Sequence, residues 1–147
     1  MLAPNIRFFV DRGVRKHFQQ TNTGPGHEWS ELKSYLLARL LWDPKMDIDA
    51  VTDEFLDGYY GRAGRPLRRY IDALHNALGR SGARLDIYEP PAVHSADHLS
   101  AADTALYDRL FDKAEAAAAG DPAVLARVRT ARLPLMYAEL EIGKDDM

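Results

Sequence analysis

The stretch from Glu28 to Gly61 constrains the fold most, because it places two amphipathic helices on either side of a proline stop. Its first half carries large apolar residues at helical spacing, namely Trp29, Leu32, Leu36 and Leu40. Three further residues, Leu37, Leu41 and Trp42, widen this apolar face. A face this broad is typical of a helix that is covered on more than one side.

The second helix of this stretch follows a short break. Proline disfavours the α conformation of the preceding residue, so Pro44 is expected to end the first helix near Asp43. Asp47 or Asp49 can cap the next helix, whose inward face is predicted to carry Ile48, Val51, Phe55 and Tyr59. The sequence therefore predicts a helical hairpin, with Trp42 and Phe55 in the stability core.

The remainder of the chain also favours helices. Helical periodicity or capping residues mark four more segments, at about 4–12, 62–78, 100–119 and 122–140. Between residues 83 and 99 no period is sustained, and Pro90-Pro91 indicates an irregular connection. The predicted fold class is mainly α, a bundle of about five to six helices.

One segment near the N-terminus is expected to be different. From Val14 to Gln20 the residues alternate, with Val14 and Phe18 on one side, which suits a single residual β-strand. A helix, an isolated strand, a loop and another helix are the order found at the end of an α/β repeat. No second strand lies nearby in the sequence, so we expect the unpaired edges of residues 1–26 either to pair with a second copy of the chain, which we favour, or to refold against the helices.

Composition excludes several functional classes. The net charge of −3 argues against a dedicated nucleic-acid-binding protein. Cysteine is absent, so disulfides and thiolate chemistry are excluded. No apolar run is long enough to span a membrane, and the charged N-terminus does not resemble a signal peptide. If the protein is exported, its export signal is expected outside this chain. Because no phosphate-binding or dinucleotide-binding loop occurs, no cofactor is expected.

The most suggestive polar cluster lies between the predicted strand and the long helix. Amide, imidazole, carboxylate and indole groups follow one another there, as Gln19, Gln20, Asn22, His27, Glu28 and Trp29. In a barrel, the loop after a strand carries ligand-binding residues. Amides and carboxylates bind sugar hydroxyls, and an indole covers the apolar side of a ring. We therefore expect a substrate-binding site for carbohydrate at Gln20, Asn22, His27, Glu28 and Trp29; an ordinary polar loop is the plainer alternative.

Two other clusters are expected to have no ligand. His94 and His98, with Asp97, have the spacing of metal ligands on a helix. They follow Pro90-Pro91 in an irregular segment without a third ligand, so we predict no metal site. The acidic residues at 53, 54 and 57 lie opposite Val51 and Phe55, which favours a solvated face over a catalytic pair. No catalytic residue is predicted.

Two motifs carry a resemblance to a known family. WSELKSYLLARLLWDPKMDIDAVTDEFLDGYYG, from Trp29 to Gly61, and GDPAVLARVRTARLPLMYAEL, from Gly120 to Leu140, resemble a bacterial family of unknown function. Its members are large proteins built like glycoside hydrolases, with a barrel related in architecture to that of the α-glucuronidases. The resemblance implies that PNIRFFVDRG is the seventh barrel helix and VRKHFQQ the eighth strand.

The resemblance also implies a domain division and a function. Residues 1–26 would be the remnant of the last α/β unit of a barrel, and residues 27–147 a C-terminal helical domain. The chain would support a carbohydrate-active protein and form a rim of its sugar site, without catalysing a reaction alone. Its expected partners are the rest of the barrel or a second copy of the chain, and the parent protein would be glycosidase-like. The alternative is a free-standing helical module for protein–protein interaction.

Overall fold

The computed structural model describes residues 2–20, 24, 26–86 and 88–144, and this part of the chain is mainly helical. In chain order the elements are α1 (Leu2–Asp11), α2 (Ser30–Trp42), α3 (Ile48–Tyr60), the 3₁₀ turn η1 (Gly61–Ala63), α4 (Gly64–Ser81), the 3₁₀ turn η2 (Pro91–His94), α5 (Ala101–Ala118) and α6 (Pro122–Lys144). The predicted helical bundle is confirmed.

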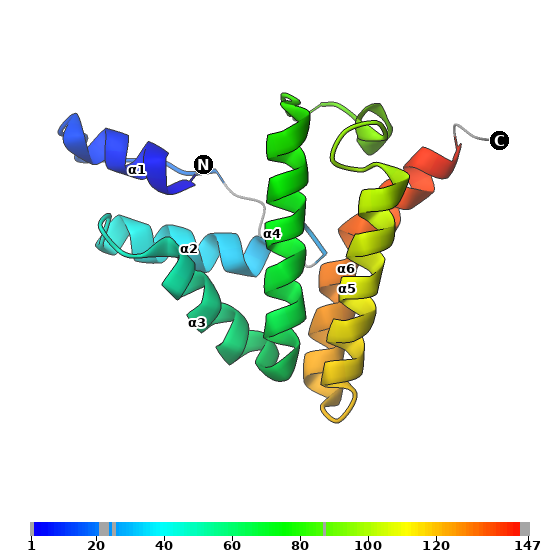
Figure 1. The fold of residues 1–147 in the computed structure, drawn as a ribbon. Helices are drawn as coiled ribbons and strands as arrows, with labels where there is room; N and C mark the ends of the chain where they lie inside the picture. Colours follow the sequence, from blue (N-terminus) through cyan, green and yellow to red (C-terminus); the bar gives the residue numbers. More distant parts are fainter. Residues whose placement is uncertain (1, 21–23, 25, 87, 145–147) are drawn as a thin grey trace.

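The helices are arranged around α4. It stands between the α2–α3 hairpin on one side and the α5–α6 hairpin on the other, with α1 beyond α2 (Figure 1). The largest side chains that are almost completely buried come from α4 itself and from both sides of it, namely Tyr107, Phe111, Leu40, Leu56, Leu67 and Val128. A single core therefore joins the two hairpins.

Local signals in the sequence set the helix boundaries. The Asp47 carboxylate caps α3 by accepting hydrogen bonds from the backbone N–H groups of Asp49 and Ala50, at 3.0 and 3.2 Å. Ser100 caps α5, since its hydroxyl accepts from the N–H of Asp103 at 3.3 Å. Each cap satisfies donors that the first helical turn leaves free.

A glycine lets α4 begin close to α3. A Cβ atom on Gly64 would lie 2.7 Å from the carbonyl oxygen of Leu56, so a side chain there would collide with backbone. The tight turn η1 brings the two helices to this distance. The start of α4 is thereby fixed against the end of α3.

Two sequence-based expectations are wrong. Val14 to Gln20 carries no strand; it lacks regular structure and is exposed throughout. A strand needs hydrogen bonds from a second strand, and the described residues supply none. Trp42, expected in the core, is 91% exposed at the end of α2. Phe55 is half-buried and packs against Tyr35 and Tyr59.

Candidate functional site

A cleft of about 820 Å³ runs along one face of α4. Its walls come from the N-terminal part of α2, from the connection around η2 and from the C-terminal half of α6. Its floor is apolar, built from Leu32, Leu36, Ile71, Leu74, Leu78 and Leu135. A cleft of this size and apolar character is typical of binding sites in proteins.

Trp29 lines this cleft in an uncommon backbone conformation. It precedes α2 with φ of 52° and ψ of 33°, the left-handed region, and it is the only non-glycine residue with positive φ in the described chain. The left-handed conformation costs a non-glycine residue roughly 1–2 kcal/mol of conformational energy. Its indole, 9% exposed, packs against the rings of Tyr60 and Tyr70, with centroids 6.2 and 5.9 Å away. This aromatic packing holds the strained turn in place.

The residues predicted to bind sugar are separated in the structure. Glu28 and Trp29 line the cleft, and the Glu28 carboxylate lies 3.8 Å from the ammonium of Lys33. Gln20 is exposed, and its backbone carbonyl accepts a hydrogen bond from Gln19. His27 is exposed and does not line the cleft. Asn22 lies outside the described residues.

A pair of histidines forms the wall of the cleft at η2. The rings of His94 and His98 are both largely buried, with centroids 4.9 Å apart. Nδ1 of His94 lies 3.2 Å from the Asp97 carboxylate, and Nε2 lies 3.6 Å from Glu89. Within the described chain no cluster of three or more potential metal ligands occurs.

The second histidine of this pair lacks a hydrogen-bond partner on one side. Nδ1 of His98 is buried and pairs with no atom among the described residues. Burial and the neighbouring His94 lower the pKa of His98 below its ordinary value, against the opposing effects of Asp97, Glu28 and Asp103. The hydroxyl of Tyr107 donates a 2.9 Å hydrogen bond to the carbonyl oxygen of His98, which fixes this segment on α5.

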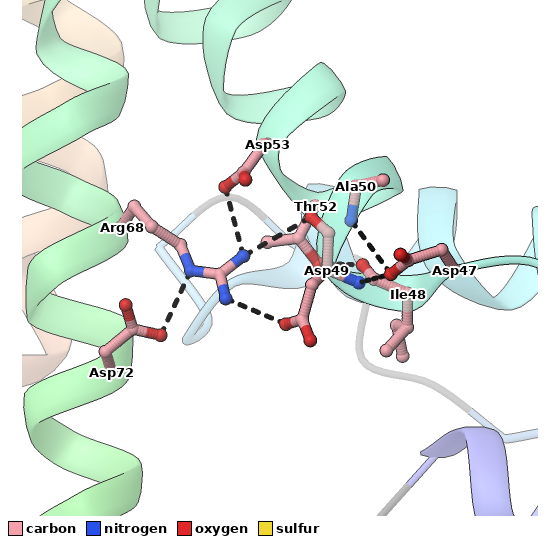
Figure 2. Close-up of polar contacts among 8 residues, drawn as sticks. All are labelled: Asp47, Ile48, Asp49, Ala50, Thr52, Asp53, Arg68 and Asp72. Atoms are coloured by element: carbon pink, nitrogen blue, oxygen red, sulfur yellow. Dashed lines mark hydrogen bonds and ion pairs between the residues drawn. The ribbon is translucent and has the colours of Figure 1, made fainter.

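The two ends of the cleft differ in how their charges are neutralised. At one end the Arg68 guanidinium binds the carboxylates of Asp72, Asp53 and Asp49, at 3.0, 3.0 and 2.8 Å (Figure 2). This network joins α4 to the start of α3. At the other end Asp86 and Glu89 line the cleft, and neither is paired with a lysine or arginine of the described chain. Negative charge therefore remains uncompensated at the η2 end.

Sequence reasoning missed most of this site. Glu89, His94 and Tyr137 reach the cleft from segments far from α2 in the chain. On α4, the spacing of Ile71, Leu74 and Leu78 indicated an apolar face but not that this face would remain partly open. No local pattern could have joined α2, η2 and α6. An apolar floor and a charged rim suit binding of an amphipathic ligand.

Residues 1–72 match the model of a protein family described as "Domain of unknown function (DUF4838)". The match covers α1, α2, α3 and the first half of α4. No curated protein and no solved structure matches the chain. None of the described helices combines the length and apolar character needed to cross a membrane.

Proposed function

We propose that this chain is a non-catalytic helical module that supports a carbohydrate-active, glycoside-hydrolase-like protein by packing against its barrel. The observation that carries the proposal is an apolar surface around α1 and the end of α2, here called the N-terminal surface. Its members are large apolar side chains that are about half exposed or more, namely Phe8, Val10, Val14, Phe18, Leu41 and Trp42.

Contacts join part of this surface into one patch, namely Val10, Val14 and Leu41. Val10, Val14 and Leu41 surround a common hollow of about 200 Å³. Arg7 donates hydrogen bonds to the carbonyl oxygens of Pro44 and Met46, at 2.8 and 3.0 Å, which fixes α1 against the turn after α2. Phe18 and Trp42 are 87% and 91% exposed, which is unusual for aromatic side chains of this size. Apolar patches of this kind mark interaction surfaces.

The sugar-site role is a second part of the same proposal. Glu28 supplies a carboxylate at the edge of the cleft, and Gln20 and His27 are exposed polar groups that precede α2. Packing of the N-terminal surface against a barrel would bring this region close to the barrel's loops. The module would then contribute hydroxyl-binding groups to the rim, while the reacting carboxylates belong to the barrel.

The test is association with a purified barrel domain taken from a protein that carries the matching family region. Isothermal titration calorimetry should detect binding, and the double variant Phe18→Asp/Trp42→Asp should weaken it at least about tenfold. Tyr88→Asp is the matched control, since Tyr88 is equally exposed but lies between α4 and α5. The proposal would be contradicted if the parent chain did not bind the barrel domain. It would also be contradicted if the parent chain, the double variant and the Tyr88→Asp control bound the barrel domain with equal affinity. The isolated chain should not hydrolyse aryl glycosides.

The second candidate function is a free-standing interaction module. The cleft favours it, because an apolar groove with an acidic end can bind a partner without any barrel. The two surfaces share no residue, so variants of one should leave the other intact.

A further inference from the structure

The cleft along α4 combines an incompletely covered apolar surface with excess negative charge at one end. We infer that it is a docking groove for an amphipathic helix of a partner protein, with the apolar face of that helix on α4 and its basic residues at Asp86 and Glu89. This inference goes beyond the support role proposed above and uses none of the residues of the N-terminal surface.

The apolar part of the groove is open to a partner. At its mouth Leu85 is 58% exposed and Tyr137 is 55% exposed, while Leu74 and Leu78 on the floor are half-buried. Tyr137 continues into an exposed apolar stripe on α6 with i, i+3, i+4, i+7 spacing, formed with Leu133, Met136 and Leu140. This spacing is the one by which helices pack against each other.

The walls of the groove select a helix over an extended strand. They are formed by side chains of α2, of the connection around η2 and of α6, and the described residues contain no sheet edge. An extended segment would leave its backbone N–H and C=O groups unpaired against such walls, whereas a helix pairs its own. From Arg68 to Leu78 the cleft follows eleven residues of α4, a rise of roughly 15 Å, which accommodates two to three turns of a bound helix.

Charge determines which helix fits. Asp86 and Glu89 lie at the η2 end without a lysine or arginine partner in the described chain, and Glu89 is 3.6 Å from His94. At the opposite end Arg68 is already bound by three carboxylates. A bound helix is therefore favoured when lysine or arginine residues lie near the end that meets Asp86 and Glu89. Basic residues near a helix C-terminus are also favoured by the helix dipole.

The fluorescence of Trp29 can report whether a ligand occupies the cleft. The chain has two tryptophans, and Trp29 lines the cleft while Trp42 lies on the N-terminal surface. In the Trp42→Phe variant the remaining indole fluorescence comes from the cleft. The probe is a synthetic peptide of leucine and lysine at helical spacing, roughly 14 residues long to reach marginal helicity. The same peptide with glutamate in place of lysine is the control for charge.

We expect the lysine peptide to change the Trp29 emission saturably, with amide NMR shifts concentrated at Leu74, Leu78, Leu85 and Tyr137. Asp86→Lys/Glu89→Lys should weaken binding about tenfold, which corresponds to about 1.4 kcal/mol. Asp11→Lys/Asp57→Lys makes the same change in net charge at exposed sites outside the cleft, and should alter affinity by less than about twofold.

Three results would overturn the inference. Equal binding of the glutamate peptide would remove the charge argument. Equal weakening by both charge-reversal variants would mean that only the overall charge of the chain matters. If the lysine peptide shifted the amide NMR signals of the N-terminal surface and left those of the cleft unchanged, the cleft would not be the docking site. If sedimentation shows that a second copy of the chain occupies the cleft and excludes the peptide, the partner helix is also rejected.

Discussion

The two tryptophans show how position on a helix decides the environment of a residue. Trp29 precedes α2 and is buried against Tyr60 and Tyr70, whereas Trp42, the last residue of α2, is exposed. Leu40 is completely buried. Two residues further along a helix correspond to a rotation of about 200°, so Trp42 points away from the face that carries Leu40. In the sequence the apolar face of this helix is so broad that Leu40 and Trp42 could not be assigned to different faces.

This contrast gives a prediction about stability. Leu40→Ala should lower the free energy of unfolding by about 2–5 kcal/mol, the range for a buried leucine. Trp42→Ala should lower it by less than about 0.5 kcal/mol, since the side chain has almost no contacts to lose. Urea denaturation at low protein concentration measures both. A cost above about 1 kcal/mol for Trp42→Ala would place that residue in the core after all.

At the scale of the elements, arginine networks join neighbouring helices. Arg132 on α6 binds the carboxylates of Asp108, Asp112 and Glu115 on α5, at 2.6, 2.8 and 2.9 Å. The three acids lie at i, i+4 and i+7, so they share one face of α5. Nearby on α6, burial and a hydrogen bond with Asp108 raise the pKa of Glu139 to about 7, although Arg132 acts in the opposite direction.

The α5–α6 contact should therefore respond to pH. Because the folded chain holds the Glu139 proton more tightly than the unfolded chain, this contribution to stability is full below pH 4.5 and is lost as the pH rises through about 7. Glu139→Gln keeps a neutral hydrogen-bonding group beside Asp108. We expect this variant to match the parent near pH 5 and to be more stable at pH 8, as measured by urea denaturation.

Glu141→Gln is the control for that experiment, because Glu141 lies on the same helix but bonds to Lys144. The difference in unfolding free energy between Glu141→Gln and the parent should stay the same between pH 5 and pH 8. If Glu139→Gln and Glu141→Gln show the same dependence of unfolding free energy on pH, the pH response does not arise from the contact between Glu139 and Asp108.

At the scale of the whole molecule, the part of the chain that the structure describes leaves two apolar surfaces exposed: the N-terminal surface and the cleft along α4. They lie on different elements and differ in character. The first carries highly exposed aromatic residues beside the basic residues Arg15 and Lys16, while the second has acidic residues at one end.

The N-terminal surface should drive self-association when no barrel covers it. Burying several large apolar side chains contributes several kcal/mol, so the full chain should sediment as a dimer at tens of micromolar. Phe18→Asp/Trp42→Asp should sediment as a monomer, and its fold should be intact because both side chains are exposed. A monomeric parent chain at these concentrations would contradict the prediction. A variant that dimerises equally well would place the interface elsewhere.

Much of the fold could be predicted because its determinants are local. Helical spacing around Leu32 and Leu36, the Asp47 and Ser100 caps and the Pro44 stop act over a few residues and are visible in the sequence. The segment from Val14 to Gln20 was predicted incorrectly because alternation is also local, whereas a strand requires a distant partner. Of the predicted sugar-binding residues that the structure describes, Glu28 and Trp29 line the cleft, whereas Gln20 and His27 do not.

The sequence alone thus indicated which segments are helical and, to within about four residues, where each helix begins and ends, because propensity, capping and proline act on near neighbours. Tertiary structure decided the rest: that Trp42 faces outward, that Trp29 adopts positive φ, and that Glu89 and His94 meet α4 across the cleft. Each of these depends on packing between segments far apart in the chain. Such packing is set by shape and burial summed over many contacts, and no short stretch of sequence records it.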